Sequence, residues 1–127
     1  MIKKAAQIFG VVFVIVGILG FAPGITTGGH LLGIFHVNTA HNMVHLLTGI
    51  IALAVGFRSE HASRVFFQVL GAVYGLVAIL GFVYGDRPIL GLISNNLADT
   101  LLHVVIACVS LCLGFMARPV QPTMKHV

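Results

Sequence analysis

The sequence predicts an all-α membrane protein with four transmembrane helices, and three observations support this fold class. Hydrophobic residues make up 58% of the 127 residues and charged residues only 8%, whereas a soluble domain averages about 45–50% and about 25%. Four apolar segments each approach the roughly 20 residues that cross the hydrocarbon core as a helix. The chain has no alternating, turn-rich pattern of a membrane barrel, so helices are expected. We expect residues 1–127 to form a single transmembrane domain.

The first helix is predicted over Ala5–Ala22, directly after Lys3 and Lys4. A signal peptide is the alternative for residues 1–24, since two lysines followed by an apolar stretch are typical of one. The segment around Pro23 is a poor cleavage site, and removal of the first helix would leave an odd number of spans. We therefore expect this helix to stay in the protein.

The other helices are predicted over Thr39–Phe57, Val65–Tyr84 and Leu97–Met116. Asparagine is among the best N-caps and stands immediately before the second and fourth of them, as Asn38 and Asn96. A Gly-rich outer loop precedes the second helix, and a shorter loop precedes the fourth. Each loop is expected either to fold back against the bundle or to lie at the membrane interface. In the last helix, two cysteines are expected as small buried hydrophobes, at Cys108 and Cys112.

The distribution of positive charge predicts the orientation of the chain in the membrane. Only Arg87 lies on one side, whereas the other side carries all the remaining basic residues. By the positive-inside rule, both termini are cytoplasmic and residues 117–127 form a mobile cytoplasmic tail. The basic residues of the cytoplasmic side are Lys3, Lys4, Arg58, Arg64, Arg118 and Lys125.

An internal repeat predicts that the four helices are a tandem repeat of two helical hairpins, over about residues 5–57 and 65–116. Ile8–Gly24 matches Val69–Gly85 at several positions, among them an ILGF run. In the second part of each repeat the polar residues match as well, because Asn38 aligns with Asn96 and His45 with His103. Two such hairpins would be related by a pseudo-twofold axis along the membrane normal. Similar composition alone is the competing explanation.

A cluster of polar residues is expected near the outer end of the bundle. His41 and His45 are four residues apart, as are Asp99 and His103, so each pair shares one face of a helix. If the two faces converge, three imidazoles and a carboxylate could bind Zn, Fe, Mn or Cu, or haem. In the structural interpretation, Asn96 and Asp99 only cap a helix, and His45 and His103 hydrogen-bond across helices to a carbonyl or to each other. A proton path is the remaining alternative.

The sequence excludes several classes of function. The seven Lys and Arg residues are dispersed and form no basic face, so no nucleic acid partner is expected. Hydrolase and phosphate-binding motifs are missing and Glu60 is the only glutamate, so we expect no enzyme. A structural or accessory subunit without a cofactor is predicted, with the lipid bilayer and a larger complex or homo-oligomer as partners. The alternative is a transition-metal or haem protein using His41, His45, Asp99 and His103.

The motifs LLGIF-x-VN, HN-x-VHLLTG and N-x-x-D-x-x-LH, together with two ILGF runs, span most of the chain. At these motifs the chain resembles the bacterial membrane proteins grouped as domain-of-unknown-function family 4383. The resemblance implies a four-helix integral membrane protein, for which a bacterial inner membrane is expected. It implies no activity, substrate or cofactor. The residues of this chain that occupy the motif positions are Asn38, His41, Asn42, His45, Asn96, Asp99 and His103.

Overall fold

The computed structural model describes residues 1–116 of the chain, and the tail predicted over 117–127 lies outside the described residues. All four helices are long and apolar enough to cross a membrane, which confirms the predicted fold class. The helices are α1 (Ile2–Leu19), α2 (Thr39–Arg58), α3 (Glu60–Tyr84) and α4 (Leu97–Phe115).

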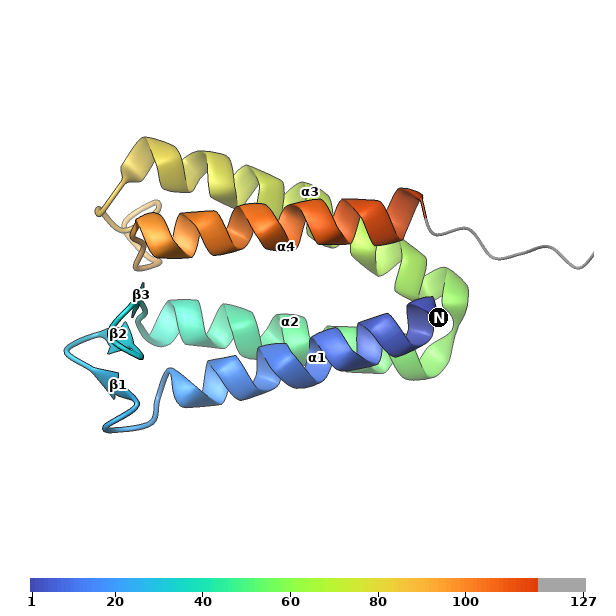
Figure 1. The fold of residues 1–127 in the computed structure, drawn as a ribbon, viewed down its shortest axis with the longest axis horizontal. Helices are drawn as coiled ribbons and strands as arrows, with labels where there is room; N and C mark the ends of the chain where they lie inside the picture. Colours follow the sequence, from blue (N-terminus) through green and yellow to red (C-terminus); the bar gives the residue numbers. More distant parts are fainter. Residues whose placement is uncertain (117–127) are drawn as a thin grey trace, which may run out of the picture.

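The helices form two hairpins, α1 with α2 and α3 with α4, which lie side by side (Figure 1). Packing is extensive within each hairpin and sparse between the two hairpins. The N-terminus and the α2–α3 connection lie at one end of the bundle. The opposite end carries the connections α1–α2 and α3–α4, and we call it the loop end.

Helix α3 begins at Glu60, earlier than the predicted start at Val65. The Oγ of Ser59 accepts a hydrogen bond of 3.0 Å from the N–H of Ala62, which caps the helix before its apolar part begins. Glu60 also places a negative charge at the positive end of the helix dipole. Hydropathy marks the membrane-crossing portion of a helix and therefore misses this polar first turn.

A small antiparallel sheet fills the loop between α1 and α2, where the sequence predicted no strands. Its turns need glycine, because Gly28 and Gly29 between the first two strands have φ values of 60° and 78°. A strand of two residues is too short to show an alternation of polar and apolar side chains, so hydrophobic periodicity does not predict it. The strands are β1 (Thr26–Thr27), β2 (His30–Leu31) and β3 (Phe35–His36), in that order.

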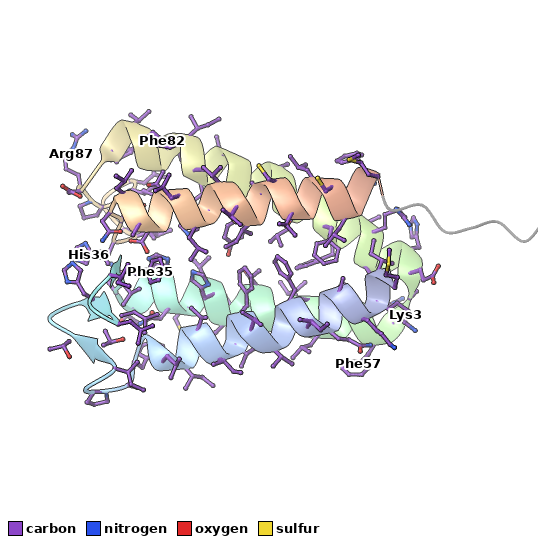
Figure 2. All side chains as sticks on the ribbon, in the orientation of Figure 1. Lys3, Phe35, His36, Phe57, Phe82 and Arg87 are labelled. Atoms are coloured by element: carbon purple, nitrogen blue, oxygen red, sulfur yellow. The ribbon has the colours of Figure 1, made fainter. Side chains whose placement is uncertain are left out.

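Aromatic side chains join the two hairpins in the centre of the bundle. The ring of Phe13 meets Tyr74 edge to face at 5.9 Å, and Phe9 meets Phe67 in the same way at 5.3 Å. Carbon-rich side chains cover the outside of all four helices, whereas Lys3, His36 and Arg87 lie toward the ends (Figure 2). An apolar exterior of this kind fits contact with a lipid bilayer.

Cys108 and Cys112 are exposed on α4, so the prediction that they are buried is wrong. Acyl chains are about as apolar as a protein core, and a cysteine that faces them is solvated much as a buried one would be. Composition alone therefore cannot separate a lipid-facing cysteine from an interior one.

Candidate polar site at the loop end

Two asparagines cap the helices that begin at the loop end. The Oδ1 of Asn38 accepts from the N–H of His41 at 2.9 Å, and the Oδ1 of Asn96 accepts from the N–H of Asp99 at 3.0 Å. These bonds pair backbone donors that a helix start leaves free.

The amide groups of the same asparagines connect the hairpins. The Nδ2 of Asn38 donates to the carbonyl of Leu92 at 2.9 Å, in the loop of the second hairpin. The Nδ2 of Asn96 donates to the carbonyl of Ile34 at 2.9 Å, in the loop of the first hairpin. Each N-cap therefore also holds the loop of the opposite hairpin.

Asp99 is only 2% exposed, and its carboxylate accepts hydrogen bonds from backbone N–H groups. Its Oδ2 accepts from the N–H of Asn96 at 3.1 Å, which completes a capping box. The same oxygen accepts from the N–H of His36 at 3.1 Å and thereby ties α4 to β3. The carboxylate predicted as a metal ligand is thus engaged with two backbone donors.

Three further buried polar residues complete the packing at the loop end. Asn42 lies against Gly20, which has no room for a Cβ atom, and Thr100 lies in the same way against Gly81. Asn95 donates through Nδ2 to the carbonyl of Gly85 at 2.7 Å and accepts from the hydroxyl of Thr100 at 3.3 Å. Asn95 and Thr100 were missed from the sequence. The alignment of Thr100 with Asn42 in the repeat is the signal that could have identified the threonine.

The structure brings together three of the predicted ligands, His41, His45 and His103. All three are buried, and one ligand nitrogen from each lies within 4.8 Å of the other two. We call these residues the histidine triad. The Nε2 atoms of His41 and His45 are 3.2 Å apart. Asp99 does not belong to this group.

Hydrogen bonding fixes the proton position on His41. Its Nδ1 lies 2.9 Å from the carbonyl of Ser94, and because a carbonyl only accepts, Nδ1 carries the proton. In the neutral ring Nε2 then presents a lone pair, which accepts from the Nε2–H of His45. In this arrangement the Nδ1 atom of His45 carries no proton and can only accept a hydrogen bond.

The Nδ1 atoms of His45 and His103 are buried, and within residues 1–116 neither has a hydrogen-bond partner. Hydrogen bonds across helices, to a carbonyl or to each other, were expected from these two histidines. Among the described residues, the bonds that join the hairpins at the loop end come from Asn38, Asn96, His41 and Asp99. Buried polar atoms without partners are rare and call for a water, an ion or a ligand.

The other histidines of the described residues do not belong to the triad. The rings of His30 and His36 stack at 4.8 Å on the small sheet, and both are half-buried rather than fully solvated. His61 is exposed near the opposite end. His126 lies outside the described residues.

A family model described as Domain of unknown function (DUF4383) matches residues 3–116. The chain belongs to this family. The match includes all four helices and the whole polar site, so the resemblance inferred from the motifs is confirmed. No curated protein and no solved structure matches the chain. The description of the family names no function. The function of the chain is therefore inferred from the residues of the polar site.

Proposed function

We propose that the chain is a non-catalytic structural protein of the membrane, acting as an accessory subunit of a larger complex. The reciprocal bonds of Asn38 and Asn96 carry this proposal. Side chains of a catalytic site are free to act on a substrate, whereas Asn38, Asn96 and Asp99 are committed to backbone atoms. Their arrangement serves to hold two hairpins in register.

We also propose that the two hairpins are a tandem repeat related by a pseudo-twofold axis along the membrane normal. Aligned residues make matching contacts, and the reciprocal asparagine bonds are one example. Gln7 donates to the carbonyl of Gly56 and Gln68 to that of Gly114, both at 2.9 Å. Leu32 and Leu90, each followed by glycine, have the rare φ values of 55° and 52°. These pairs support descent of both hairpins from one sequence.

Serine at position 38 or 96 tests the structural role. Serine caps a helix about as well as asparagine but lacks the amide that reaches the other hairpin. We expect Asn38→Ser and Asn96→Ser each to lower the free energy of unfolding in detergent by about 0.6–1.7 kcal/mol, the range of interhelical hydrogen bonds in membranes. Ser59 provides a control as Ser59→Asn, because within residues 1–116 its side chain caps α3 without bonding to the other hairpin. Unchanged stability in both site variants would refute the bridging role.

The accessory role predicts the size of the native particle. Native membranes solubilised in a mild detergent should release the chain within a larger particle, at a fixed ratio to other polypeptides. Release of all of the protein as a monomer would contradict the accessory role and leave the asparagine result intact. The two experiments therefore test the bridging and the assembly separately.

We propose a bacterial inner membrane location with both termini in the cytoplasm. Reporters fused after Val127 and inserted at Glu60 should both give cytoplasmic signals, and one inserted at Gly28 should give an external signal. The excess of basic residues at the end opposite the loops supports this orientation. A cytoplasmic signal from Gly28 would reverse the proposed topology.

Transition-metal binding is the second candidate function, and the geometry of the histidine triad favours it. Two nitrogens bound to one tetrahedral zinc at about 2.0–2.1 Å lie about 3.3 Å apart. The Nε2 atoms of His41 and His45 are separated by 3.2 Å. The bond from His41 to Ser94 is of the kind that orients metal-binding histidines. Three histidines would leave a fourth coordination position open for a water or another ligand.

Metal content distinguishes the two candidates. If the triad binds metal, the protein purified from cells should contain about one equivalent, and His41→Ala, His45→Ala or His103→Ala should each abolish most of it. A second alanine should add little, since ligands act together. Acid should release the metal because neutral imidazole is the ligand form. His61→Ala, at an exposed position, is the control. Metal-free protein with unchanged melting of the variants would exclude this candidate.

A further inference from the structure

A groove opens on the side of the bundle between α2 and α3, where the hairpins pack sparsely. Its volume is about 240 Å³. From His41 to Ile51 it follows α2 for about 15 Å, at 1.5 Å per helical residue. A second hollow shares Ile51, Phe66 and Val69 with it and continues toward the opposite end. We call the combined hollow the lateral groove.

The two parts of the lateral groove differ in chemistry. Near the loop end its lining includes the triad, the hydroxyl of Thr48 and the hydroxyl of Tyr74, which lie 3.3 Å apart. Farther along, the lining is almost entirely aliphatic or aromatic. The groove thus has a polar head region and an apolar channel, with Val69, Val73 and Phe66 in the channel.

No Lys, Arg, Asp or Glu lines the lateral groove among residues 1–116. A phosphate or carboxylate placed in the head region would lack a counter-charge in a membrane-spanning segment, which is costly. An uncharged head with hydroxyl or carbonyl oxygens suits imidazole and hydroxyl partners. The polar head region therefore discriminates against ordinary phospholipid heads.

Two buried histidines each have a ring nitrogen that could form a hydrogen bond with a ligand. His103 is 3% exposed and His45 is 6% exposed, and the Nδ1 atom of each lacks a hydrogen-bond partner in the part of the chain that the structure describes. Both residues line the groove. The ring of His103 meets that of Tyr74 edge to face at 5.5 Å, and both aromatic residues line the groove. Aromatic side chains in the lining favour a ligand whose head is itself an unsaturated ring.

We propose that the lateral groove binds a lipid-soluble quinone or its hydroquinone, an uncharged planar head on one apolar chain. The ring oxygens accept from the hydroxyl of Tyr74 and from the Nδ1–H of His103, and in the hydroquinone form one hydroxyl donates to the Nδ1 of His45. The chain lies along Val69 and Val73. Entry is directly from the bilayer, because the groove opens on the side of the bundle. Only binding is proposed, and it does not depend on the accessory role.

Because the chain has few fluorescent residues, the fluorescence of Tyr74 can report binding of a ligand in the groove. The chain has no Trp and two Tyr, so full-length protein carrying Tyr84→Phe emits from Tyr74 alone. A decyl-substituted benzoquinone added to this protein in phosphatidylcholine vesicles should quench the emission saturably. Quenching that rises linearly with quinone, without saturation, would show partitioning into lipid only and would overturn the proposal.

Two substitutions on α3 separate groove binding from general membrane effects. Val73 lines the groove and is 49% exposed, whereas Leu76 is 58% exposed and is not part of the lining. Val73→Phe should fill the channel and weaken binding by about tenfold or more, and Leu76→Phe should not change it. Equal quenching curves for both variants would overturn the proposal.

The head group is tested with His103→Leu and with two competitors. The variant should weaken quinone binding by about tenfold, since a buried hydrogen bond is lost. Decylbenzene, which lacks oxygens, should compete poorly, and so should a short-chain phosphatidylcholine. Recovery of the Tyr74 emission when either compound displaces the quinone would overturn the assignment of the head region. Val73→Phe keeps the proposal testable if His103→Leu fails to fold.

Discussion

Gly49→Val is expected to lower the free energy of unfolding by about 3 kcal/mol, at the upper end of the range for overpacking. A Cβ atom at Gly49 would lie 2.8 Å from the backbone nitrogen of Val14 and 2.9 Å from the carbonyl oxygen of Gly10. These neighbours are backbone atoms of α1 and cannot rotate away. The two helices of the first hairpin would have to separate. Unfolding of the purified protein in detergent, followed by circular dichroism, measures the change.

Gly75→Ala is the matched control for this prediction. The nearest atom to a Cβ at Gly75 is the Cβ of Ala107, at an ordinary 3.9 Å. Alanine should be neutral or stabilising by up to about 1 kcal/mol, because it has the higher helix propensity. If Gly49→Val melts at the same temperature as Gly75→Ala, the close approach of α1 and α2 is wrong.

Asp99→Ala is expected to cost about 2–4 kcal/mol. It removes the acceptor shared by the N–H groups of Asn96 and His36, and an unpaired buried donor costs about 1–3 kcal/mol. Asp99→Asn keeps a carbonyl acceptor and should retain most of the stability. Glu60→Ala is the control, since it removes an exposed first-turn acid from α3. Equal losses for Asp99→Ala and Glu60→Ala would mean that only the helix dipole matters.

Most of the fold could be predicted because a bilayer imposes a simple requirement on sequence. Apolar runs of about 20 residues locate the four spans, and Asn38 and Asn96 mark the starts of α2 and α4. The early start of α3 at Glu60 was missed because its first turn is polar. The three short strands were missed because backbone geometry at glycine, rather than side-chain periodicity, forms them.

The histidine triad was partly predictable and the connections between hairpins were not. The four-residue spacing of His41 and His45 places them on one face, and the repeat adds His103 from α4. The same spacing wrongly grouped Asp99 with them in space. At the third helical position its side chain turns back to the helix start, where backbone donors hold it. Carbonyls such as that of Leu92 carry no sequence signal, so bonds to them cannot be predicted.

The reciprocal asparagine bonds also constrain the order in which the protein is assembled. The first hairpin leaves the ribosome first, and its helices pack extensively without any contribution from the second. At that moment the amide of Asn38 and the N–H of His36 have no partner, since both partners lie beyond residue 90. A half-made protein therefore lacks the protein acceptors for two donors at one end of the membrane. The loop after α3 and the first turn of α4 supply these acceptors, so the loop end is complete only when both hairpins are present.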